Sequence, residues 1–212
     1  MSGITPRREN RIASHHRDGA RTRAGVLRLA GHPITNDPAG RTSTFTTIAQ
    51  RLLRRLPPLY GQPIRIEQSA GLRDRHSAVH AGSFLRERRI AFDCTEAEFP
   101  RIFVHELFHF VWLRLGNPIR RDWEALLQSE RKANAAGDLG WSAEWRKQAL
   151  APGDIRRRTR RWREYCCESF CDTAAWLYSG TPRHAEFTLP GRFRASRRAW
   201  FGTVLEGRQL SV

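Results

Sequence analysis

The chain has 212 residues and a formal net charge of +16, and 40% of its residues are hydrophobic, with seven Trp and eleven Phe among them. This length and apolar content predict one domain with its own core, preceded by an arm. The sequence contains neither an apolar run of about 18 residues nor an apolar segment near its N-terminus, which argues against a membrane span and a secretory leader. We therefore expect a cytoplasmic protein.

Nearly all of the positive charge comes from arginine, because Lys132 and Lys147 are the only lysines. A strongly basic chain favours nucleic acid or another acidic partner. The excess of Arg over Lys also follows from a GC-rich genome, which would add charge without any functional role. Binding to nucleic acid is therefore the secondary hypothesis about partners.

The N-terminal segment, residues 1–43, is polar, rich in Arg and interrupted by Gly, Pro and Asn. This composition predicts a disordered arm, with a basic tether to an anionic surface as the functional alternative. Regular patterns begin after it, so we place the folded domain at residues 44–212.

The first predicted elements of the domain are a helix and three strands. Apolar residues from Phe45 to Leu56 follow helical spacing, and two prolines end the helix. A tight turn at Arg86-Glu87 joins the second and third strands. The three strands are predicted at residues 63–67, 78–86 and 88–93.

The next segment, residues 103–112 (FVHELFHFVW), contains the pattern H-E-x-x-H. Positions four apart lie on one face of a helix, so His105 and His109 can reach the same metal ion. Imidazole is a preferred ligand of zinc, and Glu106 then lies beside the metal as a candidate general base.

The residues that flank this pattern are apolar nearly all round the helix, which predicts that the helix is buried. Buried imidazoles and carboxylates need partners, because unpaired buried polar groups cost several kcal/mol. A metal ion would satisfy all three groups at once. The alternative is a pair of core histidines bonded to backbone carbonyls, with Glu106 in a salt bridge.

Further along the chain, we expect a helix at about residues 122–135 and a long helix that begins near Asp154, a good N-cap. The first turns of the long helix are rich in Arg. After Gly180 the pattern predicts a short strand and a terminal helix that packs Trp200 and Phe201 inward.

The long helix carries Glu164, Glu168 and Asp172 four residues apart, so three carboxylates share one face. Such a face is repulsive unless a positive charge lies against it, and a metal ion would supply that charge. Glu168 is the preferred third metal ligand and Glu164 is its rival. A thiolate from Cys171 is a further alternative.

The chain contains four cysteines and no C-x-x-C pair. The adjacent Cys166 and Cys167 point to different faces of the predicted helix, which does not suit a disulfide framework. We expect reduced, buried thiols at these positions and at Cys94 and Cys171.

The sequence HELFH followed by ESFCD resembles the gluzincin zinc metallopeptidases, whose pattern is H-E-x-x-H followed later by E-x-x-x-D. The resemblance covers roughly residues 44–180 and suits a compact bacterial type. It implies that His105, His109 and Glu168 bind Zn2+ and that Glu106 is the general base. It also implies that Asp172 orients His105, as carboxylates behind a ligating His commonly do.

Members of this clan also use a Tyr or His to stabilise the oxyanion, and Tyr178 and His184 are the candidates here by their proximity to the Glu-bearing helix. A packed tyrosine and a surface histidine are the alternatives for these two residues. The gap of 59 residues between His109 and Glu168 is longer than in the smallest members of the clan.

The resemblance implies an α+β, zincin-like domain, with a small, mostly antiparallel sheet packed on the H-E-x-x-H helix and on a second, glutamate-bearing helix. In such domains an edge strand pairs with an extended peptide substrate. The candidate edge runs from His80 to Leu85, and an ordinary hairpin strand is the alternative.

We therefore expect a zinc-dependent hydrolase that cleaves peptide bonds in a peptide or protein substrate and does not act on membranes. The two other hypotheses are a basic protein that associates with nucleic acid through a zincin fold and a metal-binding scaffold without catalytic activity.

Overall fold

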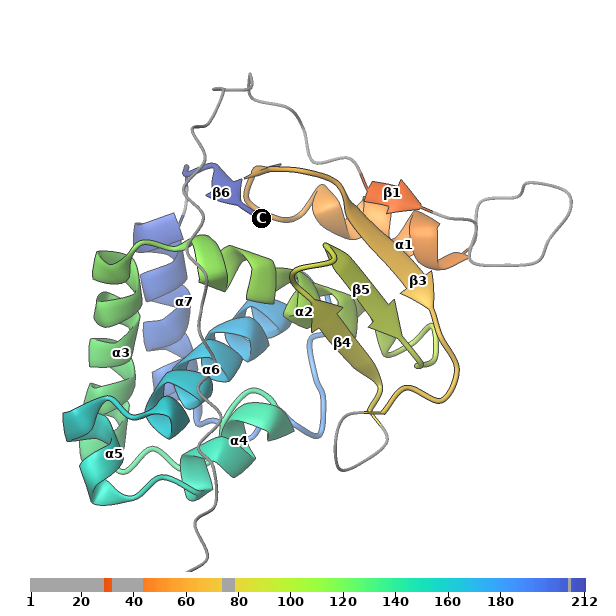
Figure 1. Cartoon of the computed structure of the whole chain (residues 1–212). Helices are drawn as coiled ribbons and strands as arrows, with labels where there is room; N and C mark the ends of the chain where they lie inside the picture. Colours follow the sequence, from red (N-terminus) through yellow and green to blue (C-terminus); the bar gives the residue numbers. More distant parts are fainter. Residues whose placement is uncertain (1–28, 32–43, 74–78, 206) are drawn as a thin grey trace, which may run out of the picture.

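The computed structural model describes residues 29–31, 44–73, 79–205 and 207–212 (Figure 1). The predicted arm at residues 1–43 lies outside this description, apart from Leu29–Gly31, which form strand β1. The other elements are α1 (Thr44–Leu53), β2 (Leu59–Tyr60), β3 (Ile64–Gln68), β4 (Ala81–Phe84), β5 (Arg89–Phe92), α2 (Phe99–Arg114), α3 (Asn117–Lys132), α4 (Trp141–Gln148), α5 (Pro152–Arg157), α6 (Arg160–Tyr178), α7 (Gly191–Leu205) and β6 (Leu210–Ser211). Helices and strands together confirm the α+β class.

Four strands form the main sheet in the order β1-β3-β5-β4. The prediction of a mostly antiparallel sheet is wrong, because β1, β3 and β5 run parallel and only the β4–β5 hairpin is antiparallel. Helix α1 lies between β1 and β3 in the sequence, and a crossover of this kind joins parallel strands. The predicted hairpin is confirmed, and β4 lies at the edge of the sheet.

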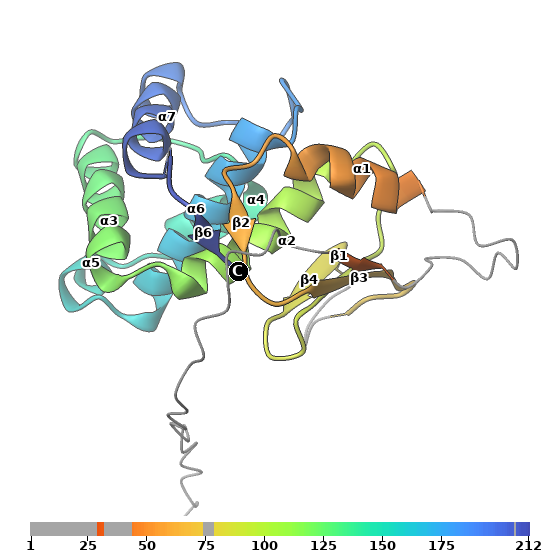
Figure 2. The same ribbon diagram turned by 90° about the horizontal axis from the view of Figure 1, so that it is seen from above.

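Helices α1 and α2 lie on the same side of this sheet (Figure 2). Three aromatic rings join the layers, because Phe45 of α1, Phe92 of β5 and Phe99 of α2 have centroids 4.6–5.0 Å apart. The inward side chains of β3, Ile64 and Ile66, are buried in the same core. This contact fixes α2 against the sheet and brings its middle turns close to β4.

Helix α2 crosses α6 at the centre of the molecule, and α3 and α7 pack on the far side of α6 (Figure 1). Phe170 of α6 is in ring contact with Phe108, Trp112, Trp123 and Phe201, which come from α2, α3 and α7. The inward packing predicted for Trp200 and Phe201 is confirmed, since these side chains are 9% and 1% exposed.

The helices beyond the crossing are joined by a buried ion cluster around Arg197. This guanidinium is fully buried, and it donates to the Glu130 carboxylate at 2.8 and 2.9 Å and to Asp138 at 2.6 Å. The Tyr165 hydroxyl donates to Asp138 at 3.1 Å. Burial would raise the pKa of Asp138, but the charge and hydrogen bonds of Arg197 lower it below its usual range. The cluster therefore ties α3, α6 and α7 to the segment before α4.

The long helix predicted from Asp154 is interrupted, so that prediction is wrong. Arg158 adopts a left-handed conformation (φ 46°) that ends α5, and its guanidinium pairs with the buried Glu124 at 2.7 and 2.8 Å. Thr159 then caps α6, whereas Asp154 lies inside the first turn of α5. Within the described ranges, none of the helices combines the length and apolar character required to cross a membrane.

Replacing Arg197 with Leu should destabilise the fold by about 3–5 kcal/mol, because two buried carboxylates lose the guanidinium that pairs with both of them. Urea unfolding followed by circular dichroism would measure the change. Arg121→Leu on the exposed side of α3 removes the same charge and should change stability by less than about 0.5 kcal/mol. Equal effects of the two substitutions would contradict the role assigned to the cluster.

Candidate metal centre and active site

The site residues of α2 lie on a helix that is buried nearly all round, as the sequence predicts. His105, Glu106 and His109 are the partly exposed positions between its buried residues. Pro100 lies in the first turn, where a missing N–H costs nothing. These three side chains face the neighbouring elements β4 and α6, which supply their partners.

His105 is oriented by Asp172 of α6. The Nδ1 atom of His105 lies 2.7 Å from the Oδ1 atom of Asp172, whose side chain is 3% exposed. A carboxylate only accepts hydrogen bonds, so Nδ1 carries a proton, and Nε2 presents its lone pair when the ring is neutral, the form that binds a metal. This contact is the one that the resemblance to gluzincins implies, and it aims the other nitrogen of His105 at the other candidate ligands.

Three candidate ligand atoms converge beside that nitrogen. The Nε2 atoms of His105 and His109 lie 3.2 Å apart, and the Oε2 atom of Glu168 lies 3.4 Å from Nε2 of His105. All three ligand atoms lie within 4.8 Å of one another. Two ligand atoms of a tetrahedral zinc ion lie about 3.4 Å apart, since each sits about 2.1 Å from the metal. The donor set and its spacing therefore fit one such ion.

Glu168 is held in place by α4. The Ser142 hydroxyl lies 2.9 Å from Oε2 of Glu168, and the Arg146 guanidinium lies 3.5 Å from Oε1. The rival ligand Glu164 points elsewhere, because its carboxylate pairs with Arg160 at 2.6 Å and is 42% exposed. The geometry favours Glu168 over Glu164 as the third ligand.

The residues of the cluster shift one another's pKa values. Burial would lower the pKa of His105, but the charge and hydrogen bond of Asp172 and the hydrogen bond of Glu168 raise it well above its usual range. Burial would likewise lower the pKa of His109, but its contact with Cys167 and the charge of Glu168 raise it to about 9. Burial would raise the pKa of Glu168, but the two histidines lower it well below its usual range. The site therefore attracts positive charge, as protons or as a cation.

Glu106 faces the edge strand of the sheet. The Ser83 hydroxyl of β4 lies 2.5 Å from Oε2 of Glu106 and 2.7 Å from its backbone oxygen. A hydroxyl donates one proton at a time, so Ser83 serves one of these acceptors or the other. The contact restrains the carboxylate next to the cavity. No motif in the sequence points to Ser83, because the contact depends on how β4 lies across α2.

Gly140 has a steric role that the sequence does not reveal. A Cβ atom at this position would lie 2.2 Å from the Asp172 carboxylate, although the backbone is extended (φ −169°). The missing side chain lets the first turn of α4 approach Asp172, and the Ala143 N–H lies 3.3 Å from its Oδ2 atom. Asp172 therefore has partners on both oxygens.

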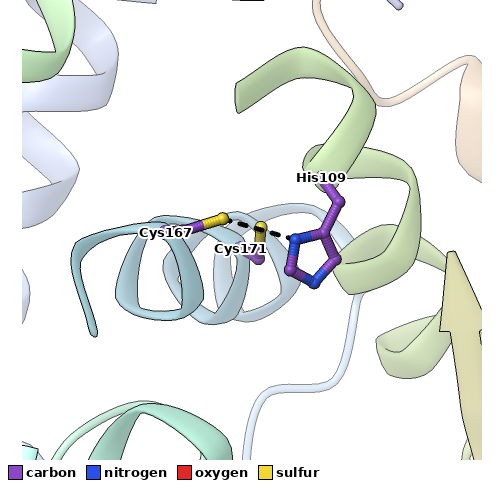
Figure 3. Close-up of side chains that lie close together, drawn as sticks. All are labelled: His109, Cys167 and Cys171. Atoms are coloured by element: carbon purple, nitrogen blue, oxygen red, sulfur yellow. Dashed lines mark hydrogen bonds between the residues drawn. The ribbon is translucent and has the colours of Figure 1, made fainter. Parts of the chain in front are cut away.

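The second nitrogen of His109 faces sulfur. The Sγ atom of Cys167 lies 3.4 Å from Nδ1 of His109, and Cys171 lies beside it on α6 (Figure 3). A hydrogen bond with Cys171 lowers the pKa of the Cys167 thiol, whereas burial raises it. The hydrogen bond with His109 lowers it further, and the pKa of Cys167 is about 6. Burial raises the pKa of Cys171 well above its usual range. His109 thus stands between two different sets of candidate metal ligands.

A cavity of about 540 Å³ opens onto the His105–His109–Glu168 cluster. One wall is formed by Val79, His80 and Ala81, at and before the start of β4. The lining also includes Trp141 and Trp145 of α4, which are 49% and 64% exposed and stack with centroids 6.3 Å apart. The start of an edge strand and an exposed aromatic pair therefore both border the cavity.

The structure does not bring the two candidate oxyanion residues into the described lining of this cavity. Tyr178 stacks on Phe108 at 5.7 Å and lines a different hollow, next to Arg55. His184 accepts from the backbone N–H of Glu186 at 3.3 Å and packs on Phe187. Tyr178 belongs to the Glu-bearing helix itself, but its ring lies against Phe108 and Phe201.

Comparison of the chain with family models, curated proteins and solved structures found no match.

Because metal ligands must lose their protons, the affinity of the cluster for Zn2+ should depend on pH. The pKa of His109 is raised to about 9, so below this pH a bound metal must displace at least that proton. We expect the affinity to rise by at least about tenfold per pH unit between about pH 6 and about pH 8. Calorimetric titrations in buffers of different ionisation enthalpy would count the released protons, and an affinity that does not change with pH would contradict this picture.

Proposed function

We propose that this protein is a zinc-dependent peptidase of gluzincin type, with a zincin-like catalytic domain. The observation that carries the proposal is the convergence of the His105, His109 and Glu168 ligand atoms, with Asp172 on the far nitrogen of His105. Two imidazoles and one carboxylate are the ligands of a hydrolytic zinc site, which keeps a further position open.

When bound at these three residues, zinc would supply Lewis acidity that favours deprotonation of water and polarises a substrate carbonyl. Glu106 would accept the proton of the attacking water and return it to the leaving amine. Its carboxylate lines the same cavity as the three ligands, and Ser83 limits its freedom to rotate. Asp172 would hold the His105 proton at Nδ1 throughout the reaction.

An extended peptide would bind along β4. This strand pairs on one side with β5 and lies at the edge of the four-stranded sheet, so the backbone groups of its other side are available to a further strand. His80 and Ala81 line the cavity beside Glu106. Pairing there would place a peptide carbonyl between the strand and the three ligands, with adjacent side chains near Trp141 and Trp145.

Glu106→Gln should keep its zinc and lose at least about a hundredfold in peptide hydrolysis, the usual contribution of general acid–base catalysis. A fluorogenic peptide library with metal analysis by mass spectrometry would measure both properties. Glu98→Gln removes the same charge from the same cavity lining without touching the proposed base, so it should retain activity. Full activity of Glu106→Gln would exclude the mechanism.

Glu168→Ala should lower zinc affinity strongly, whereas Glu164→Ala should leave it unchanged. The pair is matched because both carboxylates lie on α6, one in the cluster and one paired with Arg160 near the surface. Mutation of a residue that only hydrogen-bonds to a metal ligand typically lowers metal affinity by roughly 10–100-fold. Loss of a ligand itself should lower zinc affinity by at least as much. If the two variants exchange roles, Glu164 is the third ligand.

A further inference from the structure

The thiol pair on α6 makes a second group of potential metal ligands. Cys167 and Cys171 are four residues apart, so their side chains share one face of the helix and point towards His109 of α2 (Figure 3). Their two sulfur atoms and a nitrogen of His109 lie within 4.8 Å of one another. Cys171 is fully buried and Cys167 is partly exposed. Among the described residues, Cys94 and Cys166 belong to no such group.

The chemistry of this group differs from that of the first. Two thiols and an imidazole favour soft cations, whereas two imidazoles and a carboxylate suit borderline zinc. The two groups share the His109 ring but approach different atoms of it. Nε2 lies 3.2 Å from Nε2 of His105, and Nδ1 lies 3.4 Å from the Sγ atom of Cys167.

We propose that Cys167, Cys171 and Nδ1 of His109 form a second metal site, selective for thiophilic cations such as Cd2+, Hg2+ or Cu+, and that its occupation withdraws His109 from the first site. A neutral imidazole has one nitrogen lone pair and one N–H. His109 can therefore serve one site or the other, but not both, while it stays neutral.

Binding of Cd2+ at this site changes the protonation of three groups. Both cysteines bind as thiolates, so any proton still on either sulfur is released to solvent as two Cd–S bonds form. Where zinc occupies the first site, its bond to Nε2 of His109 breaks and Zn2+ leaves to solvent. The ring proton of His109 moves, through solvent, from Nδ1 to Nε2, and the freed lone pair on Nδ1 makes the Cd–N bond. Nε2 is then a donor and cannot bind an ion between His105 and Glu168. No oxidant or reductant is required, and the partly exposed Cys167 gives the cation its approach.

Cadmium titration tests the first half of the proposal, with a phosphine reductant in place of thiols. The thiolate–cadmium charge-transfer absorption in the ultraviolet should appear and saturate at one ion per chain. Cys167→Ser and Cys171→Ala should each weaken cadmium binding by roughly a hundredfold, since a site of few ligands loses much of its affinity with each one. Cys166→Ser, at the neighbouring position of α6, should behave like the unmodified protein. Absence of the band, or a band that survives both variants, would overturn the site.

Zinc release tests the competition, which rests on the proposed function. Cadmium should displace zinc from the unmodified protein into a colorimetric chelator, and zinc bound to Cys167→Ser should stay in place. Glu168→Gln should keep the cadmium band although it loses zinc, so a failure of the hydrolytic site is distinguishable from a failure of the thiol site. A full cadmium band with zinc still bound would overturn the competition. If circular dichroism shows that Cys171→Ala does not fold, Cys167→Ser, at the partly exposed position, serves as the test variant in both the cadmium titration and the zinc-release assay.

Discussion

The burial of α2 is the constraint on which the arrangement of the site depends. An apolar surface nearly all round this helix places it at the centre of the core, and each of its polar side chains then needs a partner from another element. His105 finds Asp172, Glu106 finds Ser83, and His109 finds Cys167. The same packing that buries the helix therefore fixes the orientation of all three groups.

The partners are positioned from behind by a polar layer that continues away from the site. Asp172 is confined by the first turn of α4, which approaches closely because residue 140 is glycine. Asp138, shortly before that turn, is held by Arg197 at 2.6 Å. The buried ion cluster and the close contact at Gly140 thus connect α6, which carries Glu168 and Asp172, to α3 and α7. The packing of the core therefore also positions the site.

Periodicity along single helices was enough to predict His105, Glu106 and His109 on one helix and Glu168 and Asp172 on another. The preference for Glu168 over Glu164 came from the resemblance to the gluzincin pattern, because both residues share one face. The contacts of Ser83, Ser142 and Gly140 depend on how separate elements meet, which no local pattern encodes. The predicted strand directions were wrong for a similar reason, because the sequence of a short strand does not indicate whether its neighbour runs parallel or antiparallel to it. The sequence pattern predicted one continuous helix from Asp154. The structure interrupts it at Arg158, whose guanidinium pairs with the buried Glu124.

The separation of the two ligand helices along the chain has a consequence for the order of folding. The hairpin of β4 and β5 and helix α2 are neighbours in the sequence and can collapse together, whereas Asp172 lies 67 positions from His105. Closing so long a loop costs entropy that only the docking of α6 repays. A chain arrested before that docking would present two imidazoles without their carboxylates. An ion that bound to all three residues would therefore recognise the finished fold alone, and its binding would add to native-state stability by mass action.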